Sequence, residues 1–150
     1  MKRITVDYVM SLNPCYDRAW VEDKFDGRKW MSPPSVLKLD ISIDDKLWLL
    51  FREDFLTYDQ LVRYATACAD HVKHRGNRNA AGNAACWSGA AAYARLAAGA
   101  AAWDARLAAE YARYASAAGE YASGAEWYVA VDDEVQWQTE LLGKILREEE

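Results

Sequence analysis

An alanine-rich repeat in the second half of the chain constrains its fold more than any other feature. Residues 94–114 read ARLAAGAAAWDARLAAEYARY, in which the unit ARLAA occurs twice at an interval of eleven residues. Alanine has the highest helix propensity, and eleven residues complete three turns at about 3.67 residues each, so equivalent side chains return to the same face. Across residues 80–125 alanine fills 22 of 46 positions and proline is absent. The repeat therefore predicts long helices.

Larger side chains form a stripe along this region at spacings of three and four residues. We expect the stripe to face the core and most charged residues to lie off the stripe. On that outer surface, Arg106–Glu110 and Glu110–Arg113 are expected to form weak pairs. On this interpretation Trp103 and Leu107 are buried, and replacing Trp103 with alanine costs about 3–5 kcal/mol. The members of the stripe are Leu96, Ala100, Trp103, Leu107, Tyr111, Tyr114, Ala118, Tyr121, Ala125 and Tyr128.

The alanine-rich region is too long for one helix, because a helix over 79–128 would be about 75 Å long. We expect a break near Gly99 or within the segment 79–89. After the repeat, Asp132 and Asp133 predict the start of a last helix by capping. The apolar face of that helix carries Val135, Leu142, Ile145 and Leu146.

Helix signals also occur in the first half, which has a mixed composition. Asn13 followed by Pro14 is a favourable helix start and predicts a helix over 14–25. Thr57 and Gln60 form a capping box that predicts a helix to about residue 74. The apolar face of this second helix carries Leu61, Ala65, Cys68 and Val72.

A connector and a short helix lie between these two helices. Residues 30–43 contain Pro33 and Pro34, which predict a rigid, extended connector over 30–35. Residues 36–44 alternate apolar and polar side chains and could form a short strand, but a turn or a short helix is expected there because no second strand is available for pairing. Asp44 predicts the start of a short helix over 45–54, and the neighbouring Asp45 is explained by the same capping role. The sequence as a whole predicts an all-α fold.

We expect one compact bundle of about five to seven helices. It forms a single domain over 1–150, with mixed-composition helices in 1–76 and long alanine-rich and C-terminal helices in 77–150. At this length the chain buries enough surface for a core without a metal or disulfide framework.

Charge and composition exclude several classes of function. The net charge of −5 is the wrong sign for neutralising phosphates, which disfavours nucleic-acid binding. The longest run without charge, over 79–94, is shorter than the ~20 residues of a membrane span. The N-terminal segment shows no export signal. Three widely spaced cysteines suit small buried groups in a reducing compartment, so we expect a cytoplasmic protein.

Two sets of residues are candidates for chemistry or binding. Cys68, His71 and His74 resemble metal-ligand spacing, but six residues turn a helix by about 600°, which points His74 away from Cys68. Cys86 with one of the histidines is an alternative nucleophile pair, so a metal- or cysteine-dependent enzyme remains the alternative of another class. We favour a protein without catalysis, cofactor or metal.

The second set is a basic patch in an otherwise acidic protein. Its residues either contact an acidic partner or are solvated charges at helix ends. They are Lys73, Arg75, Arg78, Arg95 and Arg106.

The order of these units resembles a known class of proteins. The segments ITVDYVMSLNPCYDRAWVEDKF, DKLWLLFRE, LVRYATACADHV and QWQTELLGKIL, together with the alanine-rich runs, are similar to small alanine-rich helical proteins of bacteriophages and prophages. Some of those proteins are grouped with immunity-type proteins of bacterial toxin systems. The resemblance covers most of the chain except the connector, and it implies an all-helical protein without catalysis.

The expected function is therefore binding to a bacterial protein. The first hypothesis is an accessory protein that inhibits a bacterial defence or host protein stoichiometrically, in the manner of anti-CRISPR proteins. The alternative is an immunity protein that neutralises a toxin. Self-assembly is also open, because long alanine-rich helices associate readily.

Overall fold

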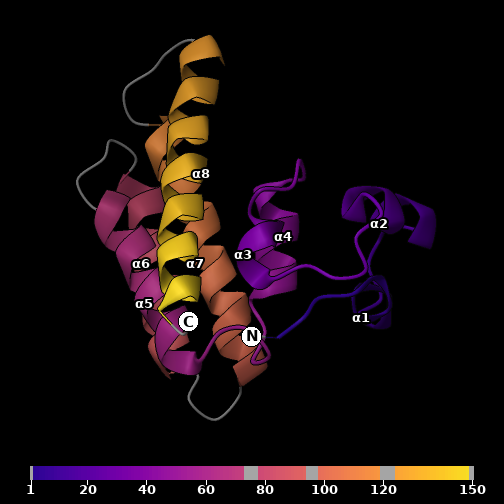
Figure 1. The fold of residues 1–150 in the computed structure, drawn as a ribbon. Helices are drawn as coiled ribbons and strands as arrows, with labels where there is room; N and C mark the ends of the chain where they lie inside the picture. Colours follow the sequence, from indigo (N-terminus) through magenta and orange to yellow (C-terminus); the bar gives the residue numbers. More distant parts are fainter. Residues whose placement is uncertain (1, 73–77, 94–97, 119–123, 149–150) are drawn as a thin grey trace.

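The computed structural model describes residues 2–72, 78–93, 98–118 and 124–148, and no β-strand occurs among them. The all-α prediction is confirmed. One isolated bridge joins Ile4 to Met31. The described helices (Figure 1) are α1 (Val6–Ser11), α2 (Arg18–Phe25), α3 (Pro33–Val36), α4 (Ile43–Leu50), α5 (Tyr58–Val72), α6 (Arg78–Tyr93), α7 (Ala98–Ala118) and α8 (Gly124–Arg147).

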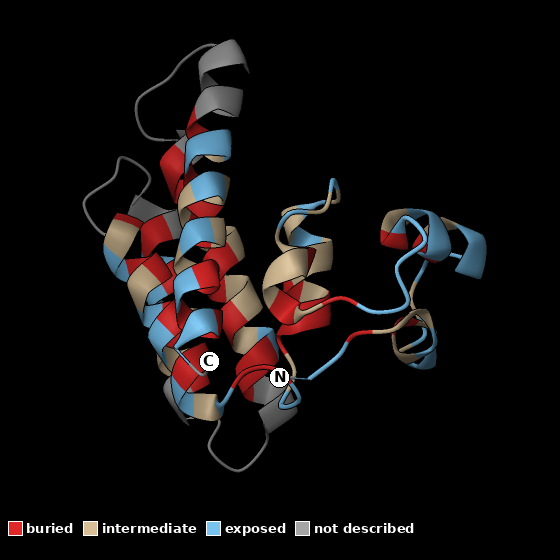
Figure 2. Ribbon diagram, viewed as in Figure 1, coloured by how far each residue is buried: buried red, intermediate tan, exposed pale blue. Residues whose placement is uncertain are grey.

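The four longest helices, α5 to α8, form a bundle, and α7 contacts α4, α5, α6 and α8. Figure 1 shows α3 and α4 beside this bundle and the α1–α2 unit on the far side of α4. Buried residues concentrate between the bundle helices, whereas α2 is mostly exposed (Figure 2). None of the described helices has the length and apolar character needed to cross a membrane.

The buried face of α7 consists of alanine together with Arg113 and Ser116, which corrects the prediction for the aromatic stripe. Trp103 is 57% exposed and Tyr114 is 47% exposed, while Leu107 and Tyr111 are half-buried. Because α5, α6 and α8 all contact α7, a wide arc of the helix must be buried, and small side chains allow the backbones to approach along this arc. The buried alanines of α7 are Ala101, Ala102, Ala105, Ala108, Ala109, Ala112 and Ala115.

The helices that face α7 also carry small buried side chains. Ala65, Cys68 and Ala69 are buried on α5, and Ala84 and Ala91 are completely buried on α6. Larger side chains fill the space further out. These are Leu61, Tyr64 and Val72 of α5 and Leu142, Ile145 and Leu146 of α8. The predicted apolar face of the 57–74 helix is therefore confirmed.

Capping explains where two of the helices begin. The backbone N–H of Thr57 donates to Gln60 Oε1 at 2.7 Å, and the N–H of Gln60 donates to Thr57 Oγ1 at 3.3 Å, so the predicted capping box forms. In α4 the N-cap is Ser42, which accepts from the N–H of Asp45 at 3.0 Å. Asp44 and Asp45 thus lie in the first turn of α4 rather than before it.

Two predicted boundaries are wrong. Helix α2 begins at Arg18 with Asp17 as its N-cap, because Asn13 takes a left-handed φ of 53° that is incompatible with a cap. Helix α8 begins at Gly124, so Asp132 and Asp133 are exposed in its middle and cap nothing. In the alanine-rich region, α6 ends at Tyr93 and α7 runs from Ala98 to Ala118, which agrees with the break expected near Gly99.

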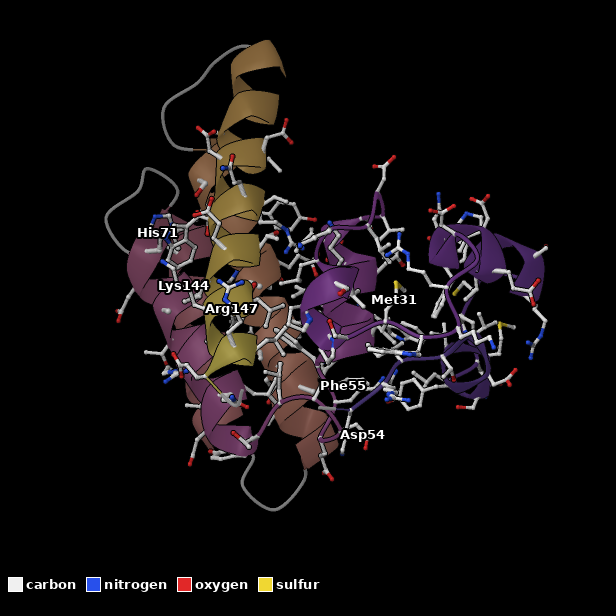
Figure 3. All side chains as sticks on the ribbon, viewed as in Figure 1. Met31, Asp54, Phe55, His71, Lys144 and Arg147 are labelled. Atoms are coloured by element: carbon white, nitrogen blue, oxygen red, sulfur yellow. The ribbon has the colours of Figure 1, made fainter. Side chains whose placement is uncertain are left out.

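The N-terminal segment is held to the rest of the protein by the connector and by Asp54. Ile4 and Met31 exchange backbone hydrogen bonds of 2.9 and 2.8 Å. Asp54 accepts from Lys2 Nζ at 2.8 Å and from the Tyr8 hydroxyl at 3.0 Å, and the edge of the Tyr8 ring meets Phe55 (Figure 3). Burial, followed by the Asp54 hydrogen bond, raises the pKa of Tyr8 to about 12. The connector forms the short helix α3 where an extended segment was predicted, because Pro33 and Pro34 occupy the first helical positions after the N-cap Ser32. A turn follows α3, as expected.

The alanine core predicts opposite stability effects on the two faces of α7. Ala105→Leu should lower the free energy of unfolding by about 1–3 kcal/mol, because Ala105 is completely buried and a larger side chain must push neighbouring helices apart. Trp103→Ala should change it by less than about 1 kcal/mol. Urea unfolding followed by circular dichroism measures both. A loss of about 3–5 kcal/mol for Trp103→Ala would show instead that the stripe is buried in the core.

Candidate functional site

Most of the basic patch predicted from the sequence cannot be assembled from the described residues. Lys73, His74, Arg75 and Arg95 lie outside them. Arg78 is the first residue of α6, and its side chain is likewise not described. Arg106 is described: it is half-buried on α7, and its guanidinium carbon lies over the Trp103 ring, 5.7 Å from the centroid. The patch as a whole therefore stays a prediction.

The burial predicted for Cys68 is confirmed, whereas Cys15, Cys86 and His71 occupy surroundings that the sequence did not indicate. Cys68 is completely buried, and burial raises the pKa of its thiol well above the usual range. Cys15 and Cys86, which were expected to be buried, are exposed. His71 is partly buried and stacks on Trp137 with ring centroids 3.8 Å apart. Among the described residues no group of three or more histidines, cysteines or acids is placed to hold a metal ion.

A chain of polar side chains crosses the bundle and includes His71. His71 Nδ1 lies 2.8 Å from Glu134 Oε2, and Glu134 is 1% exposed. Gln138 Nε2 donates to Glu134 Oε1 at 3.1 Å, and Arg113 donates to Gln138 Oε1 at 3.1 Å and to Asp44 Oδ1 at 2.6 Å. This polar chain, defined by Asp44, Arg113, Gln138, Glu134 and His71, connects α4, α7, α8 and α5.

The polar chain corrects the position predicted for Arg113. Instead of forming a surface pair with Glu110, Arg113 is 6% exposed and divides its donors between α4 and α8. A sequence signal existed on α8, because Glu134 and Gln138 precede the buried Leu142 at intervals of four residues. Two polar residues on the apolar line of a helix indicate a buried hydrogen-bonded pair.

The outward side of α7 presents the large residues that the stripe predicted, now exposed or half-buried. We call this surface the α7 face and define it by Trp103, Leu107, Glu110, Tyr111 and Tyr114. The Tyr114 hydroxyl donates to Glu110 Oε1 at 3.2 Å, and the charge of Glu110 raises the Tyr114 pKa. The Tyr111 and Tyr114 rings meet edge to face at 6.2 Å. These contacts hold the tyrosines in place on the surface.

A cavity lies beside the α7 face, between the α1–α2 unit and α4. Its volume is about 280 Å³, and its walls include Val21 and Phe25 of α2, Met31 of the connector and Leu49 of α4. Met31 lies between α4 and α2 in Figure 3. Arg106 reaches its rim from α7. We call this space the α2–α4 cavity.

Comparison with known proteins gives no relative from which a role can be transferred. No family model, curated protein or solved structure matches the chain. The α7 face, the polar chain and the α2–α4 cavity are therefore interpreted from their own geometry.

The polar chain predicts that Glu134 is the acid on which the bundle depends most. Glu134→Ala should lower the free energy of unfolding by about 3–5 kcal/mol, because it leaves the donors of His71, Gln138 and Ser116 without their acceptor. Glu140→Ala, an exposed acid on the same helix, is the control and should change it by less than about 0.5 kcal/mol. Equal losses in urea unfolding would contradict the polar chain.

The cysteines are expected to differ sharply in reactivity. In the native protein iodoacetamide should alkylate the exposed Cys15 and Cys86, whereas Cys68 should react only on unfolding, because its thiol is buried and stays protonated. Mass spectrometry of proteolytic peptides over time measures each rate. Fast native alkylation of Cys68 would contradict its placement.

Proposed function

We propose that the protein acts by binding another protein through the α7 face, without catalysis. The observation that carries this proposal is the exposure of Trp103 and Tyr114 at 57% and 47% on a helix whose opposite face is buried. Tryptophan and tyrosine are enriched at the centres of protein interfaces, where they contribute much of the binding energy. A surface that presents both on one rigid helix favours a protein partner.

The dimensions and rigidity of the α7 face support this role. From Trp103 to Tyr114 it extends about 16 Å along the helix. Alanine packing fixes the helix, and the Glu110 hydrogen bond holds the Tyr114 hydroxyl, so few side chains must be ordered on binding. Glu110 also provides an acceptor for a partner's donor group.

The partner proposed is a bacterial defence or host protein, inhibited by stoichiometric binding. The resemblance to phage and prophage accessory proteins supports this choice, and the resemblance to immunity-type proteins supports a toxin as the alternative partner. In both cases the protein blocks a partner's surface and needs no reaction of its own. Inhibition should therefore saturate at one equivalent of protein.

The α7 face is tested with a double variant and a control of matched exposure. Trp103→Ala/Tyr114→Ala should lose the partner that the unchanged protein captures from bacterial lysate, with affinity reduced at least about 100-fold once that partner is purified. Trp30→Ala removes a tryptophan that is 45% exposed on the connector and should keep full affinity. Isothermal titration calorimetry measures the three dissociation constants.

Two outcomes would overturn the proposal. The first is a double variant that is folded and binds the same partner with unchanged affinity. The second is concentration-dependent self-association in light scattering that the double variant abolishes, since the α7 face would then join two copies of this chain.

A further inference from the structure

The α2–α4 cavity has apolar walls and a rim that carries charged groups. Phe25, Met31 and Val21 are at most 3% exposed, and the partly buried Trp20 and Trp48 complete the walls. At about 280 Å³ the space is close to the lower end of small-ligand pockets, which begin at about 300 Å³. The walls therefore suit the apolar body of a compact molecule.

The carboxylates at the rim already have donors. Asp44 accepts from Arg113 at 2.6 Å. Asp45 accepts from the hydroxyls of Ser42 at 2.7 Å and Tyr16 at 3.1 Å. Asp44 is thus paired with a cation, and the oxygen of Asp45 already accepts two hydrogen bonds.

The guanidinium of Arg106 is in the opposite situation. Within the described part of the chain it forms no hydrogen bond or ion pair, and its contact is with the face of Trp103. Burial lowers the pKa of Arg106, so its charge is held where water solvates it less well. The other cation at the rim, Lys24, lies 3.8 Å from Asp23 and over the Trp20 ring. Arg106 is thus the cation that a ligand would pair with.

We propose that the α2–α4 cavity binds a small monocarboxylic acid, with its apolar body between α2 and α4 and its carboxylate paired with Arg106. A guanidinium binds a carboxylate through two parallel hydrogen bonds, which also orients the ligand. A phosphate fits less well, because its second negative charge would face Asp44 and Asp45 with one guanidinium to balance it. An uncharged molecule of the same shape would fill the walls but leave Arg106 unpaired.

Cys15 provides a reporter for occupancy of this cavity. It lies in the lining and is exposed, whereas Cys86 is exposed on α6 and serves as the internal control. Octanoate and 4-phenylbutanoate are the probes, and 1-octanol and octylamine test the headgroup. Iodoacetamide alkylation of each cysteine is followed by peptide mass spectrometry, because this reagent is uncharged.

The expected result is slower alkylation of Cys15 with octanoate or 4-phenylbutanoate and an unchanged rate at Cys86. The acid that protects Cys15 more strongly shows whether the cavity prefers a ligand with an aliphatic or an aromatic body. Octanol should protect about 10- to 100-fold more weakly than octanoate, which corresponds to the loss of a charge-assisted pair. Octylamine should not protect at all.

Variants of Arg106 separate ligand binding from folding. Arg106→Gln should reduce the protection of Cys15 by octanoate about 10- to 100-fold and leave its protection by octanol unchanged. Arg106→Lys should retain part of the protection by octanoate. Persistent protection of Cys68 shows that each variant is folded. Tyr114→Ala should bind octanoate normally, which keeps this test independent of the α7 face. Equal protection by octanol and octanoate, preference for octylamine, or no protection of Cys15 by any probe would overturn the proposal.

Discussion

Seven alanines among the described side chains of α7 are buried, and their size sets the distance at which α5 and α6 lie against this helix. Larger residues at these positions would separate the helices and open voids, which are costly in a close-packed interior. The small buried residues of α5 and α6, such as Ala65 and Ala84, meet the same requirement from the other side. The aromatic side of α7 is consequently directed away from the bundle. The candidate binding surface is thus a result of how the core is packed.

Alanine side chains are all of one small size, so they define the axial position of one helix against another only weakly. The polar chain supplies the missing specificity, because Arg113 must reach Asp44 and Gln138 together. Glu134 likewise needs its donors from α5, α7 and α8. Buried charges contribute little net stability when they are paired, but they strongly disfavour arrangements that leave them unpaired. The polar groups therefore set the position of the helices along their axes, and the alanines set the distance between the axes.

The sequence predicted what depends on neighbouring residues and not what depends on packing. The all-α fold, the Thr57–Gln60 capping box and the apolar face of α5 all follow from local spacing. The period of the stripe on α7 was predicted correctly, but its burial was not. Periodicity identifies a face of a helix without showing whether the alanine face or the tryptophan face is buried. The polar chain and the α2–α4 cavity join residues far apart in sequence, so the only local signal for either was the spacing of Glu134 and Gln138 on α8.

Arg106 stands where the two proposed surfaces meet. Its guanidinium lies over Trp103 on the α7 face and also forms part of the cavity rim. A carboxylate bound in the cavity would neutralise the positive charge beside Trp103 and compete with the aromatic ring for the guanidinium. A protein partner that places an acidic side chain near Trp103 would pair with the same guanidinium. Since one guanidinium serves both surfaces, occupation of either one changes the electrostatic character of the other.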